Sequence, residues 1–417
     1  MSDDGAMLVW VQNPFDSLPG EGARKMRFWL LCEAFVRAGH RAVLWTSDFS
    51  HATKAPRRFV GPVASEAFAV RLIPTRPYRR NVSWARVWSH CAYARAWARL
   101  ATAPGVERPD LIVCSVPTLS AAETALALGR RVGAKVVLDM MDAWPETFER
   151  LAPAGLRGLA HLALSPLRWK ARRLYRAADM VTGVCARYRA LTGRDDYFLA
   201  YHGIDCTVAM PTPAPRAAGR VRLVYAGNLG RTYDLATVVA AVRAHPEMEL
   251  DVAGFGAFAC DCPRVRAHGL LAEADLQALL AAADVGVVPM AADSWVGVPY
   301  KFCDYARAGL PIVSSLGGET ADLLVRYACG ASYRAGDAAS FAAAVRRAAS
   351  FGRGASRRMC DDLFDATRIY DGYVRTTFPL GFRAQAAGEK RYVGRHDGKK
   401  TQRVETMGSC WARHRLA

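Results

Sequence analysis

The residues best suited to chemistry lie in one short stretch of the second half of the chain. Lys301 stands one helical turn before Asp304, and Gly317-Gly318 directly precedes Glu319. A lysine is a mobile positive charge, and the free amides of a glycine turn at a helix N-terminus bind anions, so together they suit a diphosphate. A carboxylate only accepts hydrogen bonds, so Asp304 suits sugar hydroxyls such as those of a ribose. A nucleoside-diphosphate sugar would satisfy all of these groups at once.

The sequence around these residues predicts the elements that would position them. Residues 285–288 read as an apolar strand, and a polar loop leads from it to a helix over 301–308. Gly309 and Pro311 end that helix, and a second strand follows at 312–314. Parallel strands linked by helices bind ligands at the carboxyl ends of the strands. We therefore expect the candidate residues to face one crevice.

A further candidate anion site follows a strand predicted at 221–226. Gly227 ends this strand, and Arg231 comes shortly after it. Glycine lets a phosphate approach the backbone closely, and arginine donates bidentate, charge-assisted hydrogen bonds. We expect Arg231 and Lys301 to clamp one diphosphate. We also expect Lys301→Ala to weaken nucleotide binding with little change in melting temperature.

The same stretch carries a resemblance to a known family. Residues 299–311 read Pro-x-Lys-x-x-Asp-Tyr-Ala-x-Ala-Gly-x-Pro, and Gly317-Gly318-Glu319 follows. This segment is similar to the donor-site signature of the group 1 glycosyltransferases, a retaining family that uses nucleotide sugars and has the GT-B fold. That family carries two glutamates eight positions apart, whereas here the first position is Val296 and the second is Asp304. The departure resembles the branch that often serves in cell-surface polysaccharide synthesis.

The resemblance covers residues 7–378 and implies roles for individual residues. The donor site would comprise Gly227, Arg231, Lys301, Asp304, Tyr305, Gly317, Gly318 and Glu319. Asp304 would bind the ribose, and Glu319 would lie beside the sugar or the phosphate. Cationic side chains and helix N-termini can stabilise the departing nucleoside diphosphate, so we expect no cofactor and no metal ion. The transferred group would be a hexose, and its anomeric configuration would be retained.

A glycine-rich loop near the start of the chain is expected to face the same cleft. It joins a strand at 7–12 to a helix at 24–38 and contains Gly20-Glu21-Gly22, which resembles the cleft-facing loop of the same family. Arg24 and Arg27 open the helix. They can reach a phosphate or, equally, remain solvated charges on the helix surface.

Asp142 is the candidate residue for acting on the acceptor. It lies in the segment DMMDAWPE at 139–146, at the carboxyl end of a strand predicted at 135–140. The segment is similar to Asp-x-x-Asp-x-Trp-Pro-Glu in the polysaccharide branch. A carboxylate there can orient or partly deprotonate an acceptor hydroxyl, and the alternative is that Asp142 caps the turn. Farther along, His202 stands in an element similar to the one that closes the first domain of this fold, so it can face the interdomain cleft; the alternative is the structural role that lone histidines more often have.

Length and composition fit an α/β protein with two doubly wound, Rossmann-like domains that face each other across a cleft. The 417 residues are 52% hydrophobic, which is enough for two cores. A proline-rich segment near residue 210 separates an acceptor-side domain at 1–210 from a nucleotide-sugar domain at 211–355. A closing helix is expected at 356–380 and a basic, disordered tail at 383–417. No apolar run would span a membrane and no signal peptide is apparent, so we expect a cytoplasmic protein.

The formal net charge of +18 bears on partners rather than on fold. Phosphorylated substrates, an anionic membrane and nucleic acid are compatible with it, as is an arginine-rich composition without functional meaning. Helices predicted at 82–100 and 156–176 mix tryptophan with basic residues, a pattern that suits the inner face of an anionic membrane. Packing of these aromatic side chains on a sheet is the alternative. We expect a nucleotide sugar and a glycan or lipid-linked acceptor as partners, and no nucleic acid.

Two other functions remain open from the sequence. An epimerase or hydrolase of nucleotide sugars would share this fold and much of this site. A binding protein with a degenerate site would be consistent with Val296 in place of an acid. Gly254-x-Gly256-x-x-Ala259 formally matches a dinucleotide fingerprint, but the following Cys-Asp-Cys-Pro is a poor helix start, so we expect no nicotinamide or flavin site.

Overall fold

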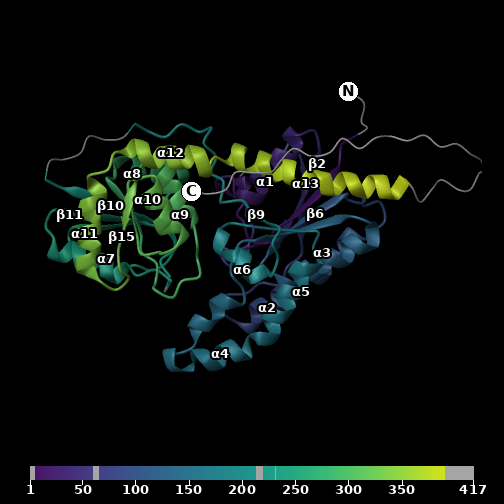
Figure 1. Ribbon diagram of the computed structural model, residues 1–417, viewed down its shortest axis with the longest axis horizontal. Coiled ribbons are helices and arrows are strands. Elements are labelled where there is room, and N and C mark those ends of the chain that lie inside the picture. The colour runs from purple at the N-terminus through teal and green to yellow at the C-terminus, as the bar shows by residue number, and fades with distance from the viewer. Residues whose placement is uncertain (1–4, 60–64, 213–218, 231, 390–417) are drawn as a thin grey trace, which may run out of the picture.

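The structure is a computed structural model of the chain, and it describes residues 5–59, 65–212, 219–230 and 232–389. Two parallel sheets, each flanked by helices, form two domains that lie side by side (Figure 1). The first sheet consists, in spatial order, of β5 (Ala69–Ile73), β2 (Arg41–Ser47), β1 (Leu8–Gln12), β6 (Leu111–Val116), β7 (Lys135–Met140), β8 (Met180–Gly183) and β9 (Tyr197–Leu199). The second consists of β12 (Val265–Gly269), β11 (Met248–Ala253), β10 (Val221–Ala226), β13 (Val285–Val288), β14 (Ile312–Ser314) and β15 (Gly330–Ser332). The predicted fold class is confirmed.

The first sheet is buried on both faces because its strands are apolar at nearly every position. Val9 and Val11 of β1 pack toward one layer, and Leu8 and Trp10 pack toward the other, as the period of two requires. The helices of this domain are α1 (Arg27–Arg37), α2 (Trp84–Ala101), α3 (Leu119–Val132), α4 (Arg157–Ala163), α5 (Ser165–Ala177) and α6 (Arg189–Thr192). A short antiparallel hairpin, β3 (Phe49–Ser50) and β4 (Ala55–Pro56), follows β2.

The second sheet follows the same plan with shorter strands. Its helices are α7 (Leu235–Ala244), α8 (Glu273–Ala282), α9 (Tyr300–Arg307), α10 (Glu319–Arg326) and α11 (Ala338–Ala349). The unit from β13 through α9 and β14 to α10 forms as the sequence predicts, and Gly309 takes a positive φ of 72° just past the end of α9. After β11 the chain turns at Gly254, and no helix begins before α8, so the dinucleotide fingerprint lacks its helix.

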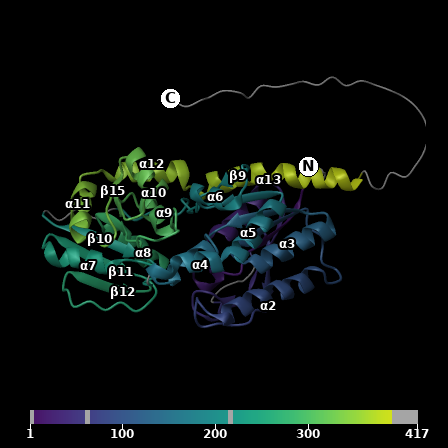
Figure 2. The same ribbon diagram turned by 60° about the horizontal axis from the view of Figure 1, so that its bottom comes forward.

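Two helices at the end of the described chain join the domains (Figures 1 and 2). α12 (Arg353–Leu363) packs on α9 of the second domain, and α13 (Ala366–Glu389) packs on α1 and β7 of the first. The prediction of one closing helix over 356–380 is therefore wrong, because this part of the chain forms two helices. Asp365 starts the second helix, since its side chain accepts a hydrogen bond from Arg368 N at 2.8 Å, while the flanking backbone bonds to Ile204. α13 also extends into the predicted tail, whose remaining residues 390–417 lie outside the described part.

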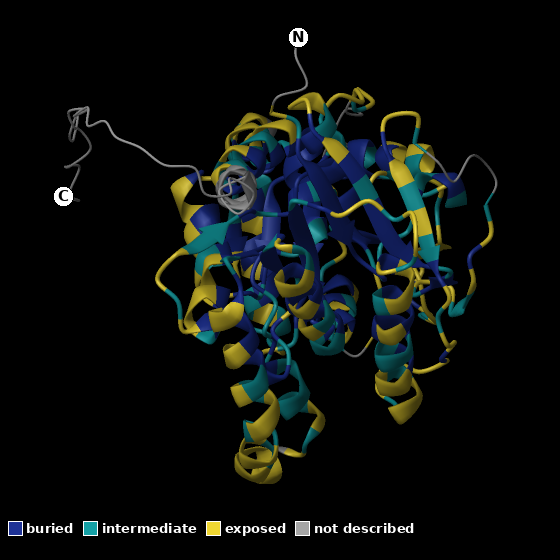
Figure 3. Ribbon diagram, turned by 90° about the vertical axis from the view of Figure 1, so that its right-hand side faces the viewer, coloured by how far each residue is buried: buried dark blue, intermediate teal, exposed yellow. Residues whose placement is uncertain are grey.

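The two tryptophan-rich helical segments of the first domain have some aromatic side chains buried and others exposed. In α2, Tyr93 and Trp97 are buried against the sheet, whereas Trp84 and Trp88 near its start are 82% and 63% exposed. The helix predicted over 156–176 is divided into α4 and α5, and Trp169 of α5 is exposed. α2, α4 and α5 lie toward the lower end of the molecule, where Figure 3 shows mostly exposed and half-buried helical residues.

Candidate active site

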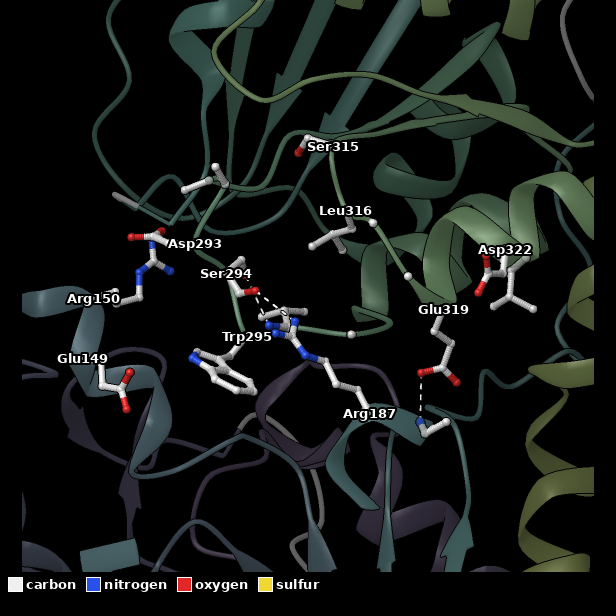
Figure 4. A pocket seen from close by; sticks show the side chains of 18 of the residues that line it. Glu149, Arg150, Arg187, Asp293, Ser294, Trp295, Ser315, Leu316, Glu319 and Asp322 are labelled. Atoms are coloured by element: carbon white, nitrogen blue, oxygen red, sulfur yellow. Dashed lines mark hydrogen bonds and ion pairs between the residues drawn. The ribbon is translucent and has the colours of Figure 1, made fainter. Parts of the chain in front are cut away.

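A pocket of about 860 Å³ opens between the two domains (Figure 4). The first domain contributes Glu149, Arg150 and Arg187, and the second contributes the loops that follow β13 and β14. Arg187 lies over Trp295, with its guanidinium carbon 4.3 Å from the ring centre. Arg150 forms an ion pair with Asp293 at 3.1 Å. The pocket is thus built from both domains and carries positive charge from the first.

The predicted glycine turn forms one wall of this pocket. Gly318 caps α10 with φ +57° and ψ −133°, and a Cβ at Gly317 or Gly318 would meet no atom within 4 Å. The turn is therefore open, and amides in the first turn of a helix have no partner within the helix. Glu319 reaches across to the first domain, where Oε2 accepts a hydrogen bond from Ala186 N at 2.8 Å and Oε1 accepts one from the Tyr201 hydroxyl at 2.5 Å.

Lys301 is buried and does not line this pocket. Its ammonium lies over the rings of Tyr233 and Tyr225, 3.6 and 4.1 Å from their centres, and donates a hydrogen bond to the Tyr225 hydroxyl at 2.9 Å. Burial lowers the pKa of Lys301 well below 10.5, and the negative charge of Asp304 opposes this shift. Gly227 leaves room for a ligand to approach the Lys301 ammonium, because a Cβ at position 227 would lie 3.0 Å from Nζ. The structure thus brings Gly227 and Lys301 together, as predicted, but away from direct solvent.

Arg231, the second half of the predicted clamp, lies outside the described residues. The chain on either side of it is described. The Ala291 amide in the pocket wall donates a hydrogen bond to Thr232 O at 2.9 Å, and Leu229 N bonds to Phe255 O at the same distance. The segment that flanks residue 231 therefore reaches the wall of the pocket. The clamp itself remains a prediction.

Asp304 is paired with Arg24 of the first domain. Nη2 of Arg24 lies 3.1 Å from Oδ2, a second contact joins Nη1 to Oδ1, and the guanidinium lies over the Tyr300 ring. Arg24 is thus neither a solvated charge nor free for a phosphate in this arrangement. A ribose would have to displace it from Asp304.

Tyr305 requires a correction. Its ring is fully buried in the core, and its hydroxyl accepts a hydrogen bond from Ala226 N at 2.8 Å and donates one to Val287 O at 3.3 Å. The side chain ties the ends of β10 and β13 together. It therefore supports the donor site from behind and has no face for a ligand.

The Gly20-Glu21-Gly22 loop also differs from expectation. Glu21 accepts hydrogen bonds from Leu18 N at 2.8 Å and from Arg57 Nη1 at 2.5 Å, so its carboxylate holds the loop in place. Gly20 is buried, and Gly22 ends the turn with φ +77°. Arg24, which follows the loop, pairs with Asp304 of the second domain. A direct role for these three residues in ligand binding is not supported by their contacts.

Arg27 is a core residue, contrary to both sequence-based readings. Its guanidinium makes a bidentate pair with Asp139, with Nε 3.0 Å from Oδ2 and Nη2 3.1 Å from Oδ1, and donates hydrogen bonds to the carbonyl oxygens of Ala200 and Tyr201. The side chains of both partners are fully buried. Burial raises the pKa of Asp139, and the charge of Arg27 opposes this shift. The pair fastens α1 to the carboxyl end of β7.

Asp142 faces the cleft at the end of β7. Its side chain is open to the cleft, although the protein that surrounds it raises the carboxyl pKa to about 6 against the opposing charge of Arg86. Burial, followed by the charge of Asp142, raises the pKa of Tyr233, so the carboxylate acts electrostatically on the tyrosine that covers Lys301. The carboxylate forms no hydrogen bond with any described residue and does not cap the turn. It is placed to accept a hydrogen bond from a ligand.

His202 lies at the junction of the domains. Its ring stacks on Tyr300, with centres 3.8 Å apart, and its buried Nδ1 has no hydrogen-bond partner among the described residues. Burial, with the nearby charges of Arg27 and Arg24, holds its pKa well below 6.5. No pattern in the sequence pointed to Tyr225, Tyr233, Arg187 or Trp295, because only the packing of the two domains brings them to the site.

Two further features bear on cofactors and location. Among the described residues, no cluster of three or more histidine, cysteine, aspartate or glutamate side chains could hold a metal ion. Within the same ranges, no helix has both the length and the apolar character needed to cross a membrane.

These features define a class of protein, namely two parallel α/β domains whose strand ends face one cleft, which is the GT-B arrangement. The sequence matches the family model of the glycosyl transferase 4-like domain over residues 25–198 and that of the glycosyl transferases group 1 over residues 220–350. The chain belongs to the group 1 glycosyltransferases. The two matches fall on either side of the predicted domain boundary.

Solved structures support the fold. Sucrose-phosphate synthase from Thermosynechococcus elongatus superimposes with a TM-score of 0.65 at 14% identity, covering 93% of this chain and 99% of that one. HepE of Anabaena in complex with UDP and glucose gives 0.57 at 14% identity, with 89% and 99% covered. The catalytic domain of starch synthase IV from Arabidopsis thaliana, bound to ADP and acarbose, gives 0.58 at 11% identity, with 92% and 100% covered. No curated protein sequence matches this chain significantly.

Proposed function

We propose that the protein transfers a hexosyl group from a nucleoside-diphosphate sugar to a hydroxyl of a lipid-linked or growing surface glycan, with retention of configuration and without a metal ion. The observation that carries this proposal is the position of Asp142. A carboxylate with a raised pKa lies exposed at the end of β7, close enough to act electrostatically on the tyrosine that covers the buried Lys301. One group suits an acceptor hydroxyl, and the other suits a departing diphosphate.

The donor half of the proposal rests on the second domain. A diphosphate oxygen approaches Lys301 past Gly227, where the missing Cβ leaves room, and replaces the Tyr225 hydroxyl as its partner. The open turn at Gly317-Gly318 supplies amides for the remaining phosphate oxygens, and Arg231 supplies a second cation. Because the leaving group gains negative charge as the glycosidic bond breaks, these groups stabilise the transition state more than the bound donor.

Binding of the nucleoside then rearranges the contacts between the domains. The ribose hydroxyls take the place of Arg24 on Asp304, so the salt bridge opens as the donor binds. Glu319 holds the first domain through Ala186 N and Tyr201. In our proposal this glutamate turns toward the transferred sugar only after that contact opens.

The acceptor half rests on the first domain. The acceptor hydroxyl donates a hydrogen bond to the Asp142 carboxylate, which orients the oxygen toward the anomeric carbon and takes part of the proton as the new bond forms. A base with a pKa of about 6 is ionised at neutral pH and still able to accept a proton.

The surface of the first domain suits a membrane-borne acceptor. Trp84, Trp88 and Trp169 are exposed, as are Leu159 and Leu162 of α4. Arg76 lies over the ring of Trp88, and Arg173 lies over that of Trp169. Exposed indoles among arginines fit the interface of an anionic bilayer, so we place the protein peripherally at the cytoplasmic face of a membrane.

The proposal is tested by following a nucleotide sugar in the absence of acceptor. UDP, GDP, ADP and dTDP are first screened for thermal stabilisation, and the corresponding sugar donors are then incubated with the protein and observed by NMR. We expect slow release of a sugar whose initial anomeric configuration matches that of the donor. Stoichiometric formation of an epimer would identify an epimerase instead.

A binding protein is the second candidate, because Val296 lines the pocket where the family carries an acid. Nucleotide stabilisation without any turnover, with or without membrane extract as acceptor, would favour it. No stabilisation by any of the four nucleotides would contradict both candidates.

A further inference from the structure

A second group of charged side chains lies in the first domain, next to Asp142. We define the cationic cluster as His51, Lys54, Arg86 and His90. His51 and Lys54 belong to the β3–β4 hairpin, whereas Arg86 and His90 are one turn apart on α2. None of these residues was singled out by the sequence, and none takes part in the donor site.

Arg86 is held flat among aromatic rings. Its guanidinium carbon lies 4.6 Å from the centre of the Trp144 ring, 5.7 Å from that of Phe15 and 5.9 Å from that of Tyr78. Nε lies 3.3 Å from His90 Nε2, and Nη1 donates to Asn81 O at 3.0 Å. These contacts orient the guanidinium and leave donor capacity at Nη2.

Lys54 lies against the same tyrosine ring as Arg86. Its ammonium lies 5.2 Å from the centre of the Tyr78 ring, 3.3 Å from His51 Nδ1, and in contact with His51 O. Burial, with the charge of Arg86, lowers the pKa of Lys54 to about 8, so the ammonium is still mostly protonated at neutral pH. Two cations therefore flank one tyrosine ring.

Neither Lys54 nor Arg86 forms a direct ion pair with a described aspartate or glutamate. Asp142 acts on Arg86 only electrostatically, without a hydrogen bond between them. Both histidines are neutral, since burial lowers their pKa to about 3. Cations that are partly removed from water, repel each other and lack a partner carry a cost, which a bound anion would relieve.

A free hydroxyl adds to the site. Thr118 precedes α3 and lines a cavity of about 10 Å³ together with Tyr78 and His90. Its hydroxyl is fully buried and has no hydrogen-bond partner among the described residues. A cavity of this size holds about one water molecule, so a phosphate group would lie outside it, where Lys54 and Arg86 both lie near the Tyr78 ring.

We propose that the cationic cluster binds a phosphate or diphosphate group of the acceptor, with Lys54 and Arg86 as its charged ligands. This inference rests on the proposed transfer reaction. Because Arg86 acts electrostatically on Asp142, an acceptor anchored there by its phosphate presents a nearby hydroxyl to that carboxylate. The acceptor is then a phosphorylated molecule, either a lipid-linked diphosphate or a soluble sugar phosphate.

Binding is measured by calorimetry with the donor site filled by saturating nucleoside diphosphate, so that added phosphates report on the cluster. Pyrophosphate, glucose 6-phosphate and farnesyl diphosphate are titrated into the protein and into the variants Lys54→Met and Arg86→Met. Loss of a charge-assisted hydrogen bond should weaken binding roughly 10- to 100-fold in each variant. Arg95→Met, an exposed arginine on the same helix, should bind as the wild type does.

The choice of phosphate distinguishes the two sources. Tighter binding of farnesyl diphosphate than of pyrophosphate would indicate a lipid-linked acceptor, and tighter binding of glucose 6-phosphate would indicate a soluble one. Equal affinities in the wild type and both variants, or no binding of any phosphate, would overturn the proposal.

Two controls keep the result interpretable. If Arg86→Met unfolds, Arg86→Lys and Lys54→Met decide the outcome, since both keep the aromatic packing. Nucleotide binding is measured separately on each variant. Its failure would contradict the proposed transfer, whereas the phosphate titrations test the cluster alone.

Discussion

The carboxyl pKa of Asp142 is raised although its side chain is exposed in the cleft. A carboxyl pKa of about 6 in the folded state, against 3.8 when unfolded, means that the folded protein binds the proton more tightly. The stability contributed by this proton is present below pH 3.8 and is lost as the pH rises through about 6. The same shift makes the ionised residue a competent base at neutral pH.

We therefore expect Asp142→Asn to reduce transfer about 10²- to 10⁴-fold, the usual effect of losing a general base. The acid limb of the pH–rate profile, with an apparent pKa near 6, should disappear. The loss of stability between pH 3.8 and 6 should disappear with it, as measured by thermal unfolding. Full activity of the variant with an unchanged pH profile would remove Asp142 from the mechanism.

Lys301 requires a revised expectation because it is buried. The sequence suggested that Lys301→Ala would leave the melting temperature nearly unchanged, but truncation would leave a cavity between Tyr225 and Tyr233. Lys301→Met fills the space and removes an amino group whose pKa lies well below 10.5. Since the unfolded chain binds this proton more tightly, wild-type stability should rise with pH between the lowered pKa and 10.5, and the methionine variant should lack that rise. Parallel stability curves for the two proteins would contradict the lowered pKa of Lys301.

The ion pair between Arg24, which follows the N-terminal loop, and Asp304 of α9 joins two elements that belong to different domains. In the absence of nucleotide, Arg24 neutralises Asp304 and ties the domains together. We expect Arg24→Ala to raise the affinity for the nucleoside diphosphate several-fold, because the ribose no longer competes with the arginine. Asp304→Asn should instead weaken binding and remove the preference for ribose over deoxyribose, measured with UDP and dUDP. Lower affinity in Arg24→Ala would show that Arg24 binds the nucleotide directly.

The buried ion pair between Arg27 and Asp139 joins α1 to β7, and its removal tests the packing of the first domain. Arg27→Met leaves Asp139 charged, buried and unpaired, so it should lower the free energy of unfolding by about 3 to 5 kcal/mol. Arg37→Met provides a matched control on the same helix, because its pair with Asp371 is exposed and contributes at most about 1 kcal/mol. Equal urea denaturation curves for the two variants would contradict this account.

The order of strands and helices could be predicted because apolar runs and glycine or proline breaks encode it locally. The unit from β13 to α10 forms where the pattern placed it. The break between α12 and α13 could not be foreseen, since it depends on backbone hydrogen bonds to Ile204, which is distant in the sequence. The same limit applies to the aromatic side chains of α2. Those near its start are exposed and those near its end are buried, and this difference depends on what packs against each half of the helix.

Side-chain roles were predicted less well than elements. Glu21, Arg27 and Tyr305 are polar or aromatic residues at the expected places, but each is bound to a partner within its own domain. Periodicity shows which residues lie near a strand end and not which of them find partners across the fold. Gly227 and Lys301 could be paired from sequence because both follow strand ends that are neighbours in a parallel sheet.

At the scale of the whole molecule, one end of the first domain carries exposed tryptophans among basic residues. We propose that this surface binds a membrane. Replacing Trp84, Trp88 and Trp169 by serine should lower the partition onto vesicles rich in phosphatidylglycerol by about tenfold or more, since about 1.4 kcal/mol of lost burial has this effect. The fold should remain intact because all three side chains are exposed. Leu270→Ser, which removes an exposed leucine from the second domain, should bind vesicles like the wild type. Undiminished binding by the triple variant would leave the basic charge alone as the cause.

The central claim is that a buried cation on the second domain receives the diphosphate of the donor. It is tested most directly by calorimetric titration of the best nucleoside diphosphate into the wild type, Lys301→Met and the control Lys25→Met, whose lysine is exposed. The account predicts roughly 10- to 100-fold weaker binding in Lys301→Met and no change in the control. Equal affinities for all three proteins would contradict it.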